Sequence, residues 1–313
     1  MSTNLSLSIG LYAPSGRGKT TLALKAFPDG IIYGPRASIR CASYLGINPT
    51  HIEATNLRSL VPALQKYGPE LAKRGSAFIA DDISLLADNE IKLFRKQGLS
   101  GWTVWEKWAD LLLESGEAAR NAPCHVLLLF HESPPKELTR HGVTSIAPGT
   151  FSLSGVKATE KLPGMMDTVM RIVHDDTILG ANNWPYVLSV EPDPMYVTKD
   201  RTNAFPRRFP LNLREPLLEA GYDIPRPKDL QWMEPVVETL ATKILKEESD
   251  PEFDLTLFFK RSASQITKKA KDIRHVRWVL SDALDRANNR RFQSTLIDTF
   301  IDNLVVNDLD DLE

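Results

Sequence analysis

A glycine-rich segment near the start of the sequence has the residue types needed to bind the phosphates of a nucleotide. Residues 13–20 read APSGRGKT, which is the Walker A pattern with alanine in place of its first glycine. Glycines let the backbone turn so that successive N–H groups point at phosphate. The Lys19 ammonium can reach the β- and γ-phosphates, and the Thr20 hydroxyl can bind Mg²⁺. We therefore predict an ATP site formed by Pro14, Ser15, Gly16, Arg17, Gly18, Lys19, Thr20 and Thr21.

The residues on either side of this segment favour the same interpretation. LSLSIGLY precedes it and is typical of a short β-strand, whereas TTLALKAF follows it and is typical of a helix that ends at Pro28. A strand, a loop and then a helix N-terminus is the geometry that binds anions. The alternative is a glycine-rich turn that binds no nucleotide.

Two aspartates at the end of a second apolar run could hold the metal. Residues 76–86 read SAFIADDISLL, so Asp81 and Asp82 follow directly after the apolar residues. A strand-end aspartate in this position of a P-loop protein holds Mg²⁺. We predict that Asp81 does so and that Asp82 shares the task. Aspartate is also a good N-cap, so the pair could begin a helix, and the two roles are compatible.

A further apolar run, CHVLLLF at 124–130, ends in His131 and Glu132. We expect His131 to sense the γ-phosphate, or Glu132 to polarise the attacking water. The alternative is a pair of loop residues without a special partner. Residues 131–155 then contain three prolines and little periodicity, and they include Lys136, Arg140 and His141. Because long loops in compact domains are usually functional or disordered, we predict one or the other here.

The order of elements predicts the α/β fold class. Apolar runs alternate with helical patterns, which is typical of a mostly parallel sheet with helices on both faces. We expect strands at 5–12, 30–33, 50–54, 77–81 and 124–130, and helices at 19–26, 56–73, 84–97 and 101–121. The runs at 167–175, 184–192 and 195–200 lack intervening helices and predict an antiparallel extension at the far edge of the sheet.

A proline-rich linker at 221–230 separates this part from a helical C-terminal region. There we expect helices at 229–248, 253–270, 272–288 and 290–306. The predicted domains are an α/β P-loop core at 1–222, a basic helical domain at 223–297 and an acidic tail at 298–313.

The composition sets limits on the class of protein. The chain has 313 residues, of which 42% are hydrophobic and 25% charged, as in soluble globular proteins. Its net charge of −2 means that any contact with nucleic acid must use a local patch. Cys41 and Cys124 lack a metal-binding spacing, and we expect them to be reduced in the cytoplasm. No apolar run is long enough to span a membrane and no signal peptide is present, so we expect no membrane partner.

Taken together, these segments resemble the RecA-like P-loop ATPases that bacteriophages encode, including the minimal RecA-type proteins of single-strand annealing and recombination. The resemblance covers roughly residues 5–220. It rests on four features in order: the P-loop, FIADDISLL, LLLFHE with the long loop and LSGVKATEKLPGMMDTVMRI, and MYVTKDRTN.

The resemblance implies a homo-oligomer assembled head to tail, with ATP between neighbouring subunits in the cytoplasm of the phage host. It implies that Lys199 and Arg201 reach the γ-phosphate of the neighbour, where a cation supplied in trans stabilises the developing charge. They could instead be a surface pair at a strand end. It also implies that residues 131–155 form a loop that binds single-stranded DNA.

One feature departs from this family. Many relatives carry a glutamate after the second strand that activates water, whereas here that strand reads IIYGPRAS. Glu53 and Glu132 are the available substitutes. We therefore expect slow hydrolysis, or a base from another part of the protein.

The C-terminal region is strongly polarised in charge. Residues 256–291 hold ten Lys or Arg and three Asp, which attract phosphate backbones unless they simply form a solvated face. Residues 298–313 hold six acidic residues and no Lys or Arg. We predict that this tail occupies the basic patch or docks on a phage or host replication or recombination protein, the alternative being a solubilising end.

The function favoured by these features is an oligomeric ATPase that acts on single-stranded DNA in phage recombination or replication. An AAA-like motor or loader that acts on a protein such as a helicase is the second hypothesis. A nucleotide-gated structural protein with little hydrolysis is the third. Stimulation of ATP turnover by single-stranded DNA distinguishes the first from the other two.

Overall fold

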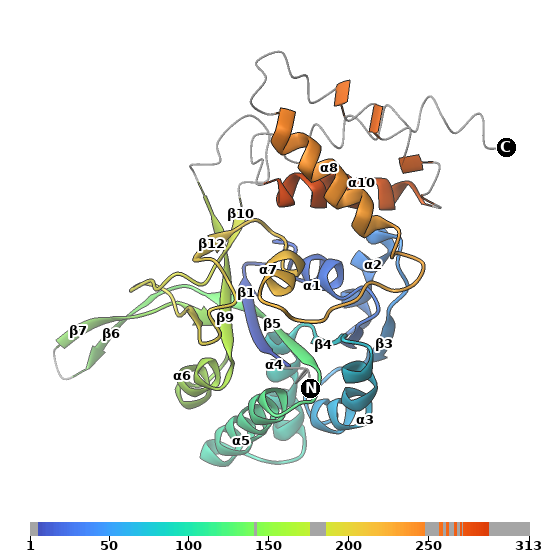
Figure 1. Cartoon of the computed structure of the whole chain (residues 1–313). Coiled ribbons are helices and arrows are strands. Elements are labelled where there is room, and N and C mark those ends of the chain that lie inside the picture. Colours follow the sequence, from blue (N-terminus) through green and yellow to red (C-terminus); the bar gives the residue numbers. More distant parts are fainter. Residues whose placement is uncertain are drawn as a thin grey trace.

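A ten-stranded β-sheet forms the centre of the protein in a computed structural model (Figure 1). The structure describes residues 6–140, 143–175, 186–247, 257–258, 261–262, 266–267, 270 and 272–287. The strand order is β12-β10-β9-β1-β5-β4-β2-β3, with β11 paired to β9 and β8 paired to β5. The strands are β1 (Ser8–Ala13), β2 (Ile31–Gly34), β3 (Thr50–Glu53), β4 (Ala77–Ala80), β5 (His125–Ser133), β8 (Thr150–Phe151), β9 (Thr168–His174), β10 (Tyr186–Ser189), β11 (Lys199–Asp200) and β12 (Arg208–Phe209).

The sheet is parallel at its centre and antiparallel at one edge. The parallel pairs join β9, β1, β5, β4, β2 and β3 in that order. Strands β10 and β11 run antiparallel to β9, and β12 runs antiparallel to β10. The predicted α/β fold class is therefore confirmed, with a mostly parallel sheet, antiparallel strands beyond the parallel core and a helical C-terminal region.

The prediction that residues 167–175 belong to the antiparallel extension is wrong. Strand β9 pairs parallel to β1, with Ile9 opposite Thr168 and Tyr12 opposite Arg171. The chain crosses over to reach this position through α6 (Val156–Met165), a helix that the sequence analysis did not expect. Pro163 and Gly164 in its last turn weaken the helical pattern in the sequence.

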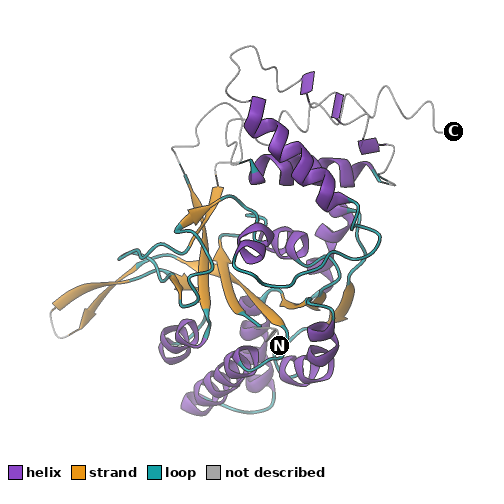
Figure 2. Cartoon of the chain, in the orientation of Figure 1, coloured by secondary structure: helices purple, strands orange, loops and turns teal. Residues whose placement is uncertain are grey.

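Helices cover both faces of the sheet because apolar side chains of each strand alternate between the faces (Figure 2). One face packs on α3 (Leu60–Lys73), α4 (Ile83–Lys96), α5 (Gly101–Arg120) and α6. The opposite face packs on α1 (Lys19–Ala26), α2 (Arg40–Leu45) and α7 (Arg214–Glu219), with the short 3₁₀ helix η1 (Arg36–Ile39) before α2. Cys124 is buried and Cys41 is half-buried, and both are free thiols.

Residues 131–155 contain a pair of antiparallel strands in place of the long irregular loop that the sequence predicts. Strand β5 continues to Ser133, and β6 (Lys136–Arg140) then pairs antiparallel with β7 (Val143–Ala147). We call residues 136–147 the arm, which projects from the body of the protein in Figure 1. The prolines at 134, 135 and 148 lie outside both strands, so they delimit the hairpin and do not interrupt it. His141 lies outside the described residues.

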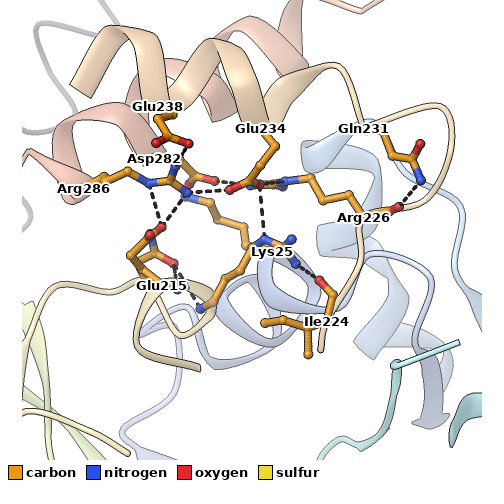
Figure 3. Close-up of polar contacts among 11 residues, drawn as sticks. Lys25, Glu215, Ile224, Arg226, Gln231, Glu234, Glu238, Asp282 and Arg286 are labelled. Atoms are coloured by element: carbon orange, nitrogen blue, oxygen red, sulfur yellow. Dashed lines mark hydrogen bonds and ion pairs between the residues drawn. The ribbon is translucent and has the colours of Figure 1, made fainter. Parts of the chain in front are cut away.

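The C-terminal helices α8 (Met233–Glu247) and α10 (Ile273–Arg286) pack together around a small core of their own. They dock on α1 through the charged network drawn in Figure 3. The Asp282 carboxylate lies 2.8 Å from Lys25 Nζ of α1 and 2.9 Å from Arg226 Nη2. Arg226 Nε also lies 3.0 Å from Glu234 of α8. This region is therefore attached to the helix that follows the P-loop.

Part of the predicted C-terminal region cannot be compared with the structure. Residues 257–258, 261–262 and 266–267 of the predicted helix 253–270 are helical. The predicted helix 290–306 and the acidic tail 298–313 lie outside the described residues. Within the described part of the chain, the model contains no helix with the length and apolar character to cross a bilayer.

Candidate functional site

The predicted phosphate-binding segment lies between β1 and α1, at the carboxyl edge of the parallel strands. Gly16 and Gly18 have φ angles of 76° and 78°, in the left-handed region that favours glycine. Pro14, Ser15 and Gly16 are exposed. The tip of the loop is therefore open to a ligand. A ligand bound there would lie at the first turn of α1, where N–H groups bind anions.

Lys19 begins α1, and its ammonium is buried beneath the loop. Lys19 is 7% exposed, and its Nζ donates to the carbonyl oxygens of Ala13 at 3.1 Å and Pro14 at 3.2 Å. Burial lowers the pKa of Lys19, and the nearby carboxylates of Asp82 and Asp81 act in the opposite direction. An anionic phosphate would therefore compensate a cation that is already in place.

The structure brings Thr20 and Asp81 together. Thr20 Oγ1 donates to Asp81 Oδ2 at 2.9 Å, and the Asp81 main-chain oxygen accepts from Ser38 Oγ at 2.8 Å. Burial raises the pKa of Asp81 overall. The hydrogen bonds from Thr20 and Ser38 and the Lys19 charge oppose this shift in part. A hydroxyl and a carboxylate oxygen side by side are the hard oxygen ligands that Mg²⁺ prefers, so these residues fit the predicted metal site.

Asp82 has two structural partners. Its Oδ1 accepts from Ser84 N at 2.8 Å and so caps α4, as the N-cap alternative predicted. Its Oδ2 forms an ion pair with Nε2 of His131. Burial raises the pKa of Asp82, and a charge on His131 lowers it. Asp82 therefore holds His131 beside Asp81, and its direct role as a metal ligand stays a prediction.

Glu132 is the next residue of β5, and it is already paired. Arg171 of β9 donates to both of its carboxylate oxygens, from Nε at 2.8 Å and from Nη2 at 3.1 Å. The pKa of Arg171 is raised by this pairing in spite of its partial burial. A carboxylate held by a guanidinium is a weaker base than a free one. Arg171 could not be recognised as a site residue from the sequence, because a polar residue in an apolar strand does not reveal its partner.

The side chain of Arg17 turns away from the loop toward β10. It donates to the Tyr186 hydroxyl, and its guanidinium carbon lies 4.4 Å from the centre of the Tyr186 ring. Arg17 thus fixes the P-loop against the antiparallel edge of the sheet. Its predicted contact with the nucleotide would come from its main chain.

Lys199 and Arg201 lie far from the P-loop of the same chain. Lys199 pairs with Val169 of β9, and its Nζ donates to Gly164 O at 3.1 Å. Arg201 N donates to Asp167 O, and Asp167 N donates to Ser8 O, at the start of β1. The P-loop begins at the other end of β1, so at 3.3 Å per residue Arg201 lies about 16 Å and Lys199 about 10 Å from it along the strand. Burial and the neighbouring Arg201 lower the pKa of Lys199 to about 8.

The predicted basic patch is partly engaged within the chain. Arg286 pairs with Glu215 at 2.8 Å and with Glu234 at 2.6 Å, and Arg274 pairs with Asp272. Arg286 is therefore part of the docking network and is not an available cation for DNA, which corrects our expectation. The remaining Lys residues of the patch, with Arg290 and Arg291, lie outside the described residues: Lys260, Lys268, Lys269 and Lys271.

We expect Asp81→Asn to lower ATP turnover more than nucleotide binding. Asparagine keeps an oxygen that accepts the Thr20 hydrogen bond, so the P-loop edge stays in place, but the negative charge beside the metal is lost. Turnover should fall by at least about tenfold, the value of one lost charge-assisted contact. The measurement is ATP hydrolysis over a Mg²⁺ titration, beside the affinity for a fluorescent ATP analogue. If Asp81→Asn hydrolyses ATP at the wild-type rate, the role of Asp81 is purely structural.

Comparison with known proteins gives low similarities. No protein-family model matches the sequence, and no curated protein sequence matches it. Among solved structures, the chain is similar to a KaiC-like protein from Pyrococcus horikoshii OT3 (TM-score 0.35, 12% identity, 65% of this chain and 84% of that chain). It is also similar to the RadB recombinase (TM-score 0.33, 13% identity, 61% of this chain and 83% of that chain). A third similar structure is the ATP synthase subunit NeqB from Nanoarcheaum equitans (TM-score 0.38, 10% identity, 95% of this chain and 74% of that chain). The fold class above rests on the strand order of this chain.

Proposed function

We propose that this protein binds ATP with Mg²⁺ at its P-loop, hydrolyses it slowly, and acts as an oligomer on single-stranded DNA in recombination or replication. The proposal rests on one observation, which is that the candidate phosphate-binding and metal-binding side chains lie together at one edge of the sheet. The buried Lys19 ammonium, the Thr20–Asp81 pair and His131 all lie there, and the arm continues from the strand that carries His131. The phage setting comes from the sequence resemblance.

Each residue of this edge has a distinct task in the proposal. The loop N–H groups and Lys19 bind the β- and γ-phosphates, and Thr20 and Asp81 hold the metal, which neutralises phosphate charge. His131, which pairs with Asp82, would sense the γ-phosphate. Glu132 is the available base. Because Arg171 neutralises it, we propose that hydrolysis without DNA is slow.

The arm is the part of the described chain that best fits single-stranded DNA. Residues 136–139 and 144–146 of its strands are exposed. Lys136 lies at the root of the arm, and the apolar side chains of Leu138 and Ile146 are 37% and 56% exposed. Nucleic-acid phosphates attract the cation, and apolar side chains can pack on unstacked bases. The acidic tail would add a contact with a replication or recombination protein.

ATP turnover with and without single-stranded DNA, at low and moderate salt, tests this proposal. We expect DNA to raise turnover, and we expect the effect to weaken as salt rises because phosphate contacts are screened. Replacing residues 138–145 by a two-residue turn should remove the stimulation and leave nucleotide binding intact. Turnover that responds to a helicase and not to DNA would favour the loader hypothesis.

The positions of Lys199 and Arg201 support a role in trans. Both lie near the amino ends of β1 and β9, so neither is placed to reach the phosphates of its own chain. An oligomer assembled head to tail would bring them to the P-loop of the next subunit, which is the arrangement that we propose.

A mixture of two inactive variants checks this role. Arg201→Ala removes the cation, Lys19→Ala removes the phosphate site, and each variant alone should be nearly inactive. When they are mixed in equal amounts, about a quarter of random interfaces pair an intact P-loop with an intact Arg201, so turnover should return in that proportion. An inactive mixture, with co-assembly shown by crosslinking, would contradict the trans role.

A further inference from the structure

Arg171 makes two different contacts with its single guanidinium. On one side it donates two hydrogen bonds to the Glu132 carboxylate, at 2.8 Å and 3.1 Å. On the other side the guanidinium carbon lies 3.2 Å from the centre of the Tyr196 ring. The side chain is 18% exposed. Bidentate pairing and stacking on a ring both depend on the orientation of the guanidinium plane, so a change at one partner is transmitted to the other.

Tyr196 is bound in turn to the root of the arm. Gly149 lies two residues after β7, its N–H donates to Met195 O at 2.8 Å, and Val197 N donates back to Gly149 O at 2.9 Å. A Cβ at Gly149 would lie 2.5 Å from Tyr196 Cε1. The absence of a side chain at Gly149 therefore lets the backbone of the arm root lie directly against the Tyr196 ring.

The same segment is anchored to the P-loop strand. Tyr12, the residue before Ala13 of β1, donates through its hydroxyl to Val197 O at 2.9 Å, and Arg171 lies opposite Tyr12 in the sheet. Glu132 follows His131, which pairs with Asp82. A continuous series of contacts thus runs from Asp82 through Arg171 and Tyr196 to Gly149.

We infer that Arg171 is a positioning residue that couples the nucleotide site to the arm. It holds Glu132 in a fixed orientation, and through Tyr196 it fixes the arm root. When the phosphates of a bound nucleotide attract His131, the adjacent Glu132 moves with it, the guanidinium reorients, and the contact between Tyr196 and Gly149 changes. This inference rests on the proposed function, because it concerns how ATP and single-stranded DNA act on each other. Such coupling is reciprocal between the two ligands.

Substitution of Tyr196 tests the inference without touching Glu132. Tyr196→Phe keeps the ring under the guanidinium, whereas Tyr196→Leu removes it. Arg171→Met removes both contacts of the guanidinium. Arg208→Met is the matched control, because Arg208 of β12 forms an exposed ion pair with Glu191 at 2.7 Å and has no part in this series.

The first measurement is hydrogen exchange of residues 143–151 and 195–198, with and without a non-hydrolysable ATP analogue. In the wild type, Tyr196→Phe and Arg208→Met, the analogue should change exchange in both segments. In Tyr196→Leu and Arg171→Met the analogue should still bind, and this change should be absent. A purely structural role of Tyr196 would raise exchange equally with and without nucleotide, and that result would overturn the inference.

The second measurement is the ratio of ATP turnover with and without single-stranded DNA. We expect a ratio of at least about fivefold in the wild type, and a ratio near one in Tyr196→Leu and Arg171→Met, with DNA still bound. A wild-type ratio in Tyr196→Leu would contradict the coupling and leave the proposed function intact. If the wild type binds no ATP analogue, the proposed function itself fails.

Discussion

Lys19→Ala should lower ATP turnover by about 10²–10³-fold, the loss that follows removal of one preorganised group that stabilises transition-state charge. Lys19 is buried, and its ammonium donates only to loop carbonyl oxygens among the contacts described above. Its position is therefore set before any phosphate arrives. Alanine keeps the helix start but removes the cation that supplements the metal at the β- and γ-phosphates, and Arg17 of the loop turns toward Tyr186 and does not replace it.

Nucleotide binding should weaken less than turnover. A hydrogen bond to a charged group contributes about 1.5–3 kcal/mol, so the dissociation constant should rise by roughly ten- to a hundredfold. The measurements are steady-state ATP hydrolysis and calorimetric titration with ATP and Mg²⁺. Lys92→Ala is the matched control, because Lys92 of α4 is exposed and its Nζ contacts only the Asn89 side chain, at 3.3 Å. Normal turnover in Lys19→Ala would disprove the P-loop assignment.

The parts of the fold that the sequence predicted are those that local chemistry determines. The P-loop glycines need their left-handed φ angles wherever the loop lies, and β1, β2, β4 and β5 are apolar because both faces of the sheet are covered. The strand that carries Asp81 could be recognised because buried aspartates rarely follow an apolar run without a function or a cap. Here Asp82 supplies the cap and Asp81 contacts Thr20.

The predictions of structure failed where tertiary contacts decide how a segment folds. Strand β9 runs parallel because α6 carries the chain across the sheet, and neither its hydrophobic pattern nor its length distinguishes it from an antiparallel strand. The arm was missed because three prolines outweighed two short alternating runs. Helical spacing also does not locate the tryptophans of α5, because Trp108 is 1% exposed and Trp102 is 79% exposed.

The pairing of charges across the sheet could not be predicted at all. Glu132 and Arg171 are 39 residues apart, and Lys25 and Asp282 are more than 250 residues apart, so no spacing rule connects them. The basic C-terminal residues looked like a surface for phosphate, yet Arg286 neutralises acids of the docking network. Counting charges along the sequence therefore overestimated the cations available to DNA.

Asp282→Ala should destabilise the attachment of the C-terminal helices by about 3–5 kcal/mol, the cost of leaving buried charges without their partner. Asp282 is buried between two cations, Lys25 and Arg226 (Figure 3). Burial alone would raise its pKa, but Lys25 and Arg226 lower it overall, so it stays ionised in the folded protein. Its removal leaves the Arg226 side chain, which is 2% exposed, with Glu234 as its remaining ion pair.

The destabilisation should be local, because α8 and α10 have their own core. Their apolar residues pack on each other, and they meet the rest of the protein mainly at α2 and at the charged network. Loss of the network should therefore release these helices together and leave the sheet folded, as cooperative units with separate cores do. This outcome would also place a domain boundary close to the predicted one at residues 222 and 223.

Hydrogen exchange resolved by segment separates this outcome from global unfolding. In Asp282→Ala, amides of 233–247 and 273–286 should lose protection, whereas those of β1, β4 and β5 should keep it. The matched control is Glu191→Ala, which breaks the exposed pair with Arg208 and should change stability by at most about 1 kcal/mol. If the sheet loses protection together with the helices, the C-terminal region is part of one cooperative unit with the P-loop, and Asp282 stabilises the nucleotide site through Lys25 and α1.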